Sequence, residues 1–201
     1  HCISSAASDV YKRQSMARAA NFAAGLGLSG LEFAHGIPGS VGGGLYMNAG
    51  AYGGEMKQVA VRTEYLDAAG NLRCLDGAEQ GFSYRRSAIT GSTHVIVAGT
   101  FALTPDAESK IRETMQELMA RRKASQPLEL PSAGSTFKRP VGGYAAALIE
   151  QAGLKGVQIG GAAVSSKHTG FVVNLGGATE ADVLALIAYI QKRVLETSGI
   201  A

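Results

Sequence analysis

Cysteine is scarce in this sequence, which has only Cys2 and Cys74, and tryptophan is absent. Two cysteines cannot build the disulfide framework of a small secreted protein, so a reducing cytoplasm is the expected location. No apolar stretch approaches the roughly 18 residues that a membrane span requires, and the first residues do not resemble a signal peptide. We therefore expect a cytoplasmic protein without a membrane partner.

Charge is sparse as well, because charged residues make up 17% of the chain and the formal net charge is only +3. Such a small excess does not indicate a nucleic-acid partner, although it would suit a small anionic ligand. No pair of histidines or cysteines has the spacing of metal ligands, so no metal is expected. The 46% apolar content is typical of an ordinary globular protein.

Glycine is abundant: the chain has 27 glycines, and 11 of them fall within residues 25–54. So dense a stretch rarely forms regular structure, and it predicts loops. The G-x-G-x-x-G pattern at Gly25, Gly27 and Gly30 follows a helical segment rather than a strand, so we interpret it as a chance match. The run 36–44 could cradle an anion or lie against a flat ring, and tight turns are its plainer interpretation.

The remaining patterns predict an α+β protein in two units, 15–124 and 125–201. Residues 1–14 lack strand or helix periodicity and are interpreted as a non-native tail. In the first unit we expect a helix over 15–24, a hairpin over 58–75, a strand over 94–103, and a helix that Thr104 caps, with Pro105 at its first position and Asp106 in its first turn, and that ends near 123. In the second unit we expect an irregular linker over 126–139, a helix over 144–152, strands over 157–159 and 171–174, and a helix capped by Thr179 and Asp182 that ends at Gly199.

Three polar segments are candidates for chemistry. Arg85 lies beside Tyr84, and a guanidinium fork suits a carboxylate or phosphate, with a solvated surface side chain as the alternative. Ser135 is followed by Lys138 and could donate a proton or hold an anion, although loop serines usually form turns. His168 is the only histidine in a polar, basic, loop-like setting, and a ligand-facing role is as plausible as a structural one.

Four segments resemble, in the same order, successive motifs of one family, the UDP-N-acetylenolpyruvoylglucosamine reductases. Their sequences are GLEFAHGIPGSVGGGLYMNAGAYGGEM, FSYRRS, PSAGSTFKRP and AGLKGVQIGGAAVSSKHTGFVVNLGGATEADVLALI. Each motif alone would be weakly specific, but the resemblance extends from residue 17 to the C-terminal end. The short connection between VIVAGTFAL and the following helix is similar to the shorter type of the family.

The resemblance implies that residues 15–124 are part of an FAD-binding domain of the PCMH type, and that residues 125–201 form a small α+β substrate-binding domain. It also implies that NADPH reduces FAD, which passes hydride to the enolpyruvyl double bond of UDP-N-acetylglucosamine enolpyruvate. The product would be UDP-N-acetylmuramate for peptidoglycan synthesis, made by a monomeric cytoplasmic enzyme.

The resemblance also assigns roles to residues at matching motif positions. It implies that Arg85 stabilises the substrate carboxylate and the developing enolate, and that Ser135 donates the proton, with help from a cation such as Lys138. The expected cofactor-binding residues are Gly36, Ile37, Pro38, Gly39, Ser40, Val41, Gly42, Asn48, Ala49, Gly50, Ala51 and Ile96. The expected substrate-binding residues are Tyr84, Lys123, Lys138, Arg139, Lys167, His168 and Asn174.

Two departures from the family pattern concern the ends of the sequence. The family begins with another flavin-binding subdomain and ends with a segment that holds a catalytic glutamate, which Glu196 does not match. We therefore expect the intact gene product to be an active reductase, and this chain alone to be weakly active or inactive. The alternatives are a flavoprotein oxidase with the same FAD-domain architecture, or a non-catalytic module that binds nucleotide sugars.

Overall fold

The chain folds into two compact units, His1–Ala120 and Arg121–Ala201. The computed structural model describes residues 6–11, 14–141 and 143–200, with side chains described for 14–132, 134–141 and 143–200. Residues 1–5, which include Cys2, and residues 12 and 13 of the expected tail lie outside this range. Each unit has its own antiparallel sheet with helices packed against it, which confirms the α+β class.

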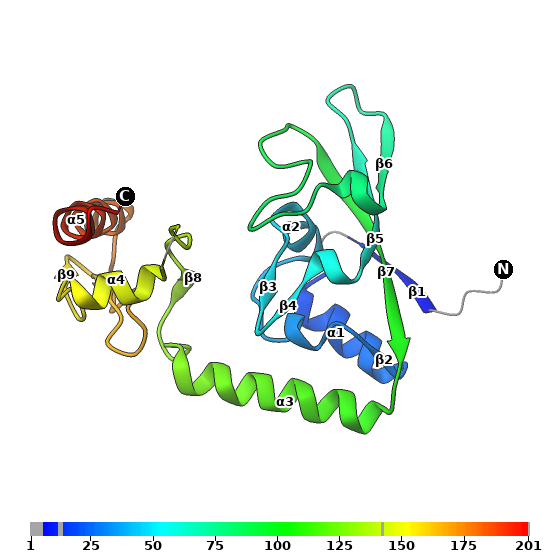
Figure 1. Ribbon diagram of the computed structural model, residues 1–201, viewed down its shortest axis with the longest axis horizontal. Coiled ribbons are helices and arrows are strands. Elements are labelled where there is room, and N and C mark those ends of the chain that lie inside the picture. Colours follow the sequence, from blue (N-terminus) through cyan, green and yellow to red (C-terminus); the bar gives the residue numbers. More distant parts are fainter. Residues whose placement is uncertain (1–5, 12–13, 142, 201) are drawn as a thin grey trace. The chain divides into compact units, whose positions relative to one another are not determined.

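The sheet of the first unit consists of β1 (Ala6–Tyr11), β2 (Leu28–Ser29), β5 (Ala60–Leu66), β6 (Leu72–Asp76) and β7 (Val95–Pro105). Its strand order is β1-β7-β5-β6, and β2 pairs with the last residues of β7 (Figure 1). The hairpin of β5 and β6 and the strand β7 confirm the predictions for these segments. The long strand β7 therefore organises this unit.

Strand β1 corrects the expectation that the first fourteen residues lack regular structure. It pairs with β7 along its whole length, from Ala6 opposite Leu103 to Tyr11 opposite Ala98. A strand ladder is made by backbone N–H and C=O groups, so it does not require the alternation of side chains that the sequence lacks here.

Helix α1 (Met16–Gly25) confirms the first predicted helix. Ser15 caps it, because the Ser15 hydroxyl accepts the N–H of Arg18 at 3.2 Å. One face is buried against the rest of the unit, and it consists almost entirely of alanine. These small side chains let the helix backbone approach its neighbours closely.

Helix α2 (Val41–Tyr46) lies within the glycine-rich stretch, where the sequence predicted loops, and that prediction was wrong. Ser40 caps this helix by accepting the N–H of Gly43 at 3.1 Å. A side chain at Gly44 would lie 2.8 Å from the sulfur of Met16 on α1. The glycine is needed because α1 and α2 pack in close contact, and packing outweighs the low helix propensity of glycine.

Helix α3 (Glu108–Ser125) begins later than predicted. Thr104 and Pro105 belong to β7, because β2 pairs with this end of the strand and places Leu28 opposite Pro105. The cap predicted at Thr104 was therefore wrong. One face of the helix is apolar, and its residues Ile111 and Met115 are buried in the core. The remaining elements of the unit are β3 (Gly50–Ala51), β4 (Gly54–Glu55) and the single 3-10 turns η1 (Glu32–Ala34), η2 (Met56–Gln58) and η3 (Gly77–Gln80).

The turn between β5 and β6 is held by the carboxylate of Asp67, which accepts the backbone N–H groups of Asn71 at 2.9 Å and Ala69 at 3.0 Å. The hydrogen bond from the Asn71 backbone, followed by those from the Asn71 and Arg73 side chains, lowers the pKa of Asp67 from 3.8 to about 2. A carboxyl whose pKa is depressed in the folded state stabilises that state above its unfolded pKa, and the stabilisation is lost as pH falls through the folded pKa.

We therefore expect Asp67→Asn to reduce the pH dependence of stability in acid. The unfolding free energy of the unaltered protein should fall between about pH 4 and about pH 2, and this fall should be smaller in the variant. Urea titrations at several pH values measure the difference. Identical slopes in the two proteins would contradict the role of this carboxylate.

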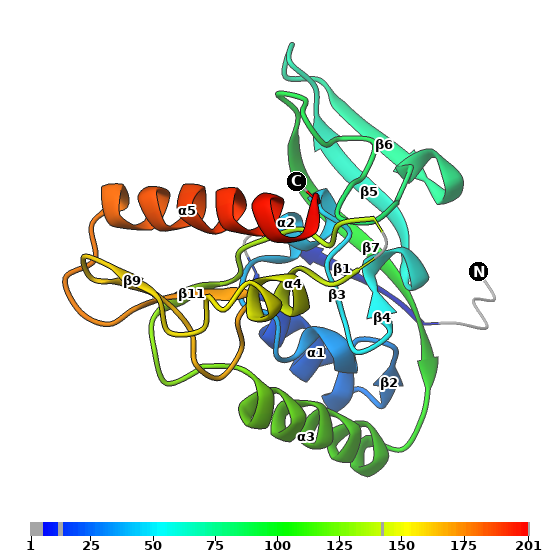
Figure 2. The ribbon, with the colours of Figure 1, turned by 60° about the vertical axis from the view of Figure 1, so that its left-hand side comes forward.

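The second unit has a four-stranded antiparallel sheet of order β8-β11-β10-β9, with two helices (Figure 2). Its elements are β8 (Ser132–Ser135), α4 (Ala145–Gln151), β9 (Gln158–Ile159), β10 (Ala162–Val164), β11 (Phe171–Asn174) and α5 (Glu180–Ser198). Helix α5 packs on β9 and β10, and its buried residues Leu186 and Ile190 meet Ile149 of α4 in one core.

Both predicted helices of the second unit are confirmed. Thr179 and Asp182 form the predicted capping box of α5, and Gly199 ends the helix with a φ of 70°. The irregular linker predicted over 126–139 is wrong where β8 forms, and β10 was not predicted. Both strands are short and rich in small residues, so their pairing depends on the neighbouring strand β11 rather than on a side-chain pattern.

Candidate functional site

A groove of about 540 Å³ in the first unit brings together three residues predicted to bind the cofactor, Ser40, Gly42 and Ile96. The start of α2 forms one wall and the start of β7 forms the other. Ile96 is also part of the core, with 7% of its surface exposed, so the groove lies directly on the packed interior. The complete lining is Ser40, Gly42, Gly43, Tyr46, His94, Val95 and Ile96.

This groove fits a flat, largely apolar ring system. Gly42 and Gly43 present backbone without side chains, and Val95 and Ile96 add an apolar surface. Tyr46 contributes a ring at the edge, where 37% of its surface is exposed. Backbone that carries no side chain can lie directly against a planar ligand, and aromatic rings favour stacked contacts.

Tyr46 also holds a neighbouring loop. Its carbonyl oxygen accepts the hydroxyl groups of Ser87 at 2.7 Å and Thr90 at 3.0 Å, and its own hydroxyl accepts the N–H of Gly91 at 2.9 Å. The segment 81–91, which contains Arg85, is thus fastened to the last residue of α2.

The residues Asn48 to Ala51, also predicted to bind the cofactor, do not line the groove. The Asn48 side chain is 1% exposed and fully engaged. Its amide nitrogen donates to Glu55 at 2.9 Å and to the carbonyl of Ser83 at 3.1 Å, and its oxygen accepts the N–H of Lys57 at 2.9 Å. Asn48 therefore supports the turn that follows Ser83. The structure does not place the predicted residues Gly36 to Gly39 on the groove lining.

Arg85 lies at the tip of a tight turn. Ser83 and Arg86 close this turn with reciprocal backbone hydrogen bonds of 3.0 and 3.1 Å. Arg85 has a φ of +56°, in the left-handed region that residues other than glycine rarely adopt. Its guanidinium donates to the Gly50 carbonyl at 3.3 Å and lies 5.3 Å from the centre of the Tyr84 ring. Strained backbone of this kind is concentrated at functional sites.

A second groove, of about 380 Å³, lies in the second unit and is lined by the predicted residues Lys167 and His168. Tyr144 and Lys155 line it too, and the guanidinium of Arg139 lies 4.4 Å from the centre of the Tyr144 ring. This part of the unit gathers several cations beside one aromatic ring, and the carboxylate of Glu150, which also lines the groove, lies 3.5 Å from the ammonium of Lys155. The cations that line the groove outnumber this carboxylate, so the groove suits an anion such as a phosphate.

The environment of His168 determines which ring nitrogen can donate. Nδ1 accepts the N–H of Gly170 at 3.2 Å, so the neutral ring carries its proton on Nε2. Lys167 has a different setting, because its ammonium donates to the carbonyl oxygen of Lys123 at 2.6 Å and lies 3.6 Å from Glu129. Lys123 thus contributes a carbonyl that orients Lys167 at the end of α3.

Three further predicted residues lie elsewhere in the second unit. Ser135 is exposed in β8 opposite Phe171, and within the described part of the chain its hydroxyl has no hydrogen-bond partner. Lys138 lines a separate, mostly apolar pocket of about 330 Å³ beside α4 and α5. The Asn174 side chain accepts the N–H groups of Gly176 and Ala178, so it stabilises a turn.

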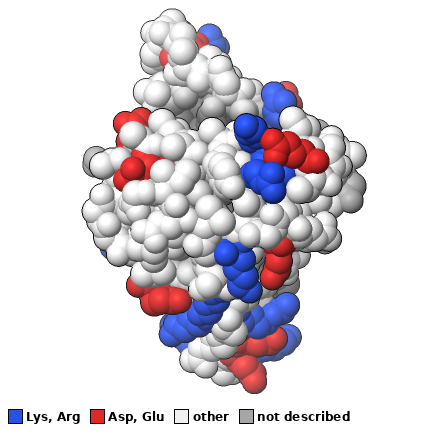
Figure 3. Space-filling model, turned by 90° about the vertical axis from the view of Figure 1, so that its left-hand side faces the viewer, with Lys and Arg blue, Asp and Glu red and all other residues white. Residues whose placement is uncertain are grey.

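The charges on the visible face in Figure 3 are mixed, with Lys and Arg side chains beside Asp and Glu side chains, most densely in the lowest part of the view, where α3 lies. Exposed pairs such as Arg112 with Glu108 at 2.6 Å account for part of this pattern. The visible face therefore carries no extended surface of a single charge sign. Within the described ranges, no helix is long and apolar enough for a membrane span, and no cluster of potential metal ligands occurs.

Sequence reasoning missed Tyr46, His94, Tyr144 and Lys155, which line the two grooves. None belongs to a local pattern that indicates a ligand, since Lys155 is a single cation between apolar residues and glycine. His94 was recognised only as the start of a strand. In the structure its ring stacks on Tyr65 with the centroids 4.9 Å apart.

The fold and the grooves define an α+β protein of two units, one with a glycine-lined groove and a strained arginine turn, the other with a basic groove. Comparison of this chain with known proteins identifies its family. The C-terminal domain model of UDP-N-acetylenolpyruvoylglucosamine reductase matches residues 126–201. A solved structure of that reductase from Thermus caldophilus matches with a TM-score of 0.81 and 35% identity, over 92% of this chain and 67% of its own. The chain belongs to the UDP-N-acetylenolpyruvoylglucosamine reductase family.

Reductases of two further organisms are more similar in sequence. The protein of Levilactobacillus brevis is 56% identical over 173 residues, which make up 86% of this chain and 57% of the relative. The protein of Caldanaerobacter subterraneus is 53% identical over 173 residues, with the same coverage of 86% and 57%. The chain thus spans 57% of the length of each of these curated relatives.

Proposed function

We propose that this chain provides the substrate-reducing part of an enzyme that converts UDP-N-acetylglucosamine enolpyruvate to UDP-N-acetylmuramate. The observation that carries this proposal is the match to the Thermus caldophilus reductase, which extends over 92% of the chain with 35% sequence identity. The enzyme would act in the cytoplasm as a monomer, with NADPH as the source of hydride, and its product would serve peptidoglycan synthesis.

The groove of Ser40, Gly42 and Ile96 is the part of the chain that would hold FAD, within a domain of the PCMH type. FAD, once reduced by NADPH, would supply the hydride for the enolpyruvyl double bond. The chain's own contribution there is the bare backbone of Gly42 and Gly43 beside the apolar side chains of Val95 and Ile96, against which a ring system can be oriented. Asn48 would contribute indirectly, because its side chain fixes the adjoining turn.

Arg85 is the residue proposed to hold the substrate carboxylate. Hydride addition to the enolpyruvyl group places negative charge on that carboxylate and the carbon beside it, and a fixed guanidinium stabilises the charge. Ser135 is proposed to donate the proton that completes the lactyl ether, which its unpartnered hydroxyl permits. Lys155 and Lys167 of the second groove, together with Arg139 beside the Tyr144 ring, would bind the diphosphate, and the Nε2–H of His168 would add a hydrogen bond.

Replacing Ser135 with alanine in the intact gene product tests the proton-donor assignment. We expect formation of the lactyl ether to fall at least about 100-fold, because general-acid catalysis contributes that much, while binding of the enolpyruvyl nucleotide changes little. Mass spectrometry measures the product and calorimetry measures binding. Ser132→Ala, on the same strand, is the matched control.

The alternatives predict different outcomes for the intact gene product supplied with FAD and NADPH, because this chain alone is expected to be weakly active or inactive. Nucleotide-sugar binding without flavin reduction would favour a non-catalytic binding module. Flavin reduction that never leads to reduction of the enolpyruvyl group would favour a flavoprotein of another kind. Equal turnover of the Ser135 and Ser132 variants would remove Ser135 from the mechanism.

A further inference from the structure

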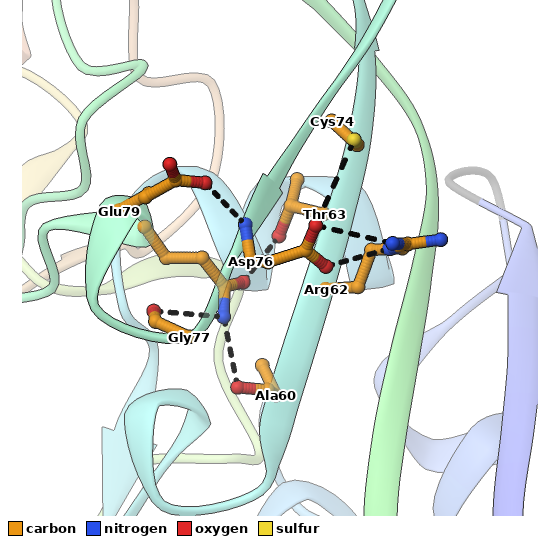
Figure 4. Close-up of polar contacts among 8 residues, drawn as sticks. Ala60, Arg62, Thr63, Cys74, Asp76, Gly77 and Glu79 are labelled. Atoms are coloured by element: carbon orange, nitrogen blue, oxygen red, sulfur yellow. Dashed lines mark hydrogen bonds and ion pairs between the residues drawn. The ribbon is translucent and has the colours of Figure 1, made fainter.

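A buried glutamine lies at the base of the loop that carries Arg85. Gln80 is the last residue of η3, and 1% of its surface is exposed. Its side-chain nitrogen donates to the Ala60 carbonyl at 2.9 Å and more weakly to the Gly77 carbonyl at 3.4 Å. Its oxygen accepts the hydroxyl of Thr63 at 2.7 Å, so the glutamine joins η3 to strand β5 (Figure 4).

The surroundings of this amide leave no room for a water molecule that could replace a lost partner. Thr63 is itself only 3% exposed. The interior space between Thr63, Gln80, Phe82 and Ile89 is too small to admit a water molecule. A buried donor or acceptor that loses its partner here therefore remains unsatisfied, which is costly.

The backbone of Gln80 connects these side-chain hydrogen bonds to the loop that carries Arg85. Its carbonyl oxygen accepts the N–H of Ala88 at 2.9 Å, which joins the two ends of segment 81–87. Within that segment the Ser83–Arg86 turn holds Arg85 in its left-handed conformation. A strained residue keeps such a conformation only where the surrounding structure determines it.

We propose that Gln80 and Thr63 form a positioning pair that keeps the Arg85 turn in the geometry needed to hold the carboxylate of the substrate. Neither side chain faces the substrate, and both act through the backbone of the loop. This proposal rests on the proposed function for its substrate, but its structural part concerns the loop alone. Two hydrogen-bonded polar side chains specify one arrangement in a place where apolar side chains of similar size would pack in several.

The test uses a pair of variants of Thr63 that separate its hydroxyl from its shape. Thr63→Val keeps the branched shape and removes the hydroxyl, whereas Thr63→Ser keeps the hydroxyl. In Thr63→Val, hydrogen exchange at the Ala88 N–H should accelerate about tenfold, the factor that corresponds to loss of one buried hydrogen bond. Exchange at the Ala102 N–H, in the middle of β7, should change much less, and Thr63→Ser should restore slow exchange at Ala88.

The second measurement compares two ligands, UDP-N-acetylglucosamine enolpyruvate and UDP-N-acetylglucosamine, which lacks the carboxylate. Thr63→Val should reduce the preference for the enolpyruvyl ligand about tenfold and leave affinity for the other ligand unchanged. Gln80→Leu should also reduce the preference for the enolpyruvyl ligand.

Each outcome decides one part of the proposal. Equal acceleration at Ala88 and Ala102 would reveal a general loss of stability and would overturn the positioning role. A loop that loosens without any change in ligand preference would overturn the link to Arg85. If the unaltered protein does not distinguish the two ligands, the proposed function fails, and the exchange rates still decide whether the pair positions the turn.

Discussion

Replacing Arg85 with alanine or with glycine is expected to weaken binding of the enolpyruvyl nucleotide equally while affecting stability differently. Both variants lose the guanidinium, and truncating one partner of a desolvated charge pair costs about 2–5 kcal/mol, or roughly 30-fold or more in affinity. Glycine tolerates a φ of +56°, whereas alanine does not. Arg85→Gly should therefore be more stable than Arg85→Ala by about 1 kcal/mol.

Calorimetry measures the two affinities, and urea unfolding measures the two stabilities. The neighbouring Arg86, which is exposed and has an ordinary φ, provides the control, because its glycine variant should gain no stability over its alanine variant. Equal stability of the two Arg85 variants would show that the turn is not strained. Unchanged affinity in both would remove Arg85 from the substrate site.

Replacing Gly161 with alanine should destabilise the second unit by more than about 3 kcal/mol, at the upper end of the cost of overpacking. A Cβ at this position would meet the backbone nitrogen of Ala178, and it would lie 2.6 Å from both the Ala178 Cα and the Gly176 oxygen. These are backbone atoms of the turn before α5, so no side-chain rotation can relieve the contact. The Gly161 carbonyl also accepts the N–H of Leu175 at 2.9 Å, which keeps the two segments together.

Urea titration followed through the methyl signals of Leu186 and Ile190, in the core of this unit, measures the loss. Gly143→Ala is the matched control, because a side chain there has no atom within 4 Å and the backbone does not have a positive φ. A Gly161 variant as stable as the Gly143 variant would mean that the turn can move away from the added methyl group.

The sequence predicted those elements whose signals are local. The alanine-rich run of α1, the capping box of Thr179 and Asp182, and the alternation in β5 and β6 each depend on residues a few positions apart. Helix α2 was missed because its glycines have low helix propensity. The need for glycine in this helix is explained only by the structure, in which Gly44 packs against Met16 of α1. Strand β8 depends in the same way on a partner that is distant in sequence.

In the candidate site, too, local patterns could be predicted from the sequence, whereas contacts between distant segments could not. Residue types in short motifs indicated Arg85, Ser135 and His168, and the structure describes the strain, exposure and hydrogen bonding of each. It could not be predicted that Asn48 uses its entire side chain within the protein, or that Lys167 is oriented by a carbonyl at the end of α3. Such contacts join segments that no local pattern relates, and a buried glutamine such as Gln80 has no recognisable sequence signal at all.

Tyr46 belongs at once to the glycine-lined groove and to the anchor of the Arg85 loop. A ligand that favours one position of this residue also favours one position of the loop, because three hydrogen bonds connect them. The free energies of binding at the two places are then linked, and the linkage is reciprocal by thermodynamic necessity. Under the proposed function, the cofactor would raise the affinity for substrate by the same factor as the substrate raises the affinity for cofactor. Tyr46 would connect the two binding places.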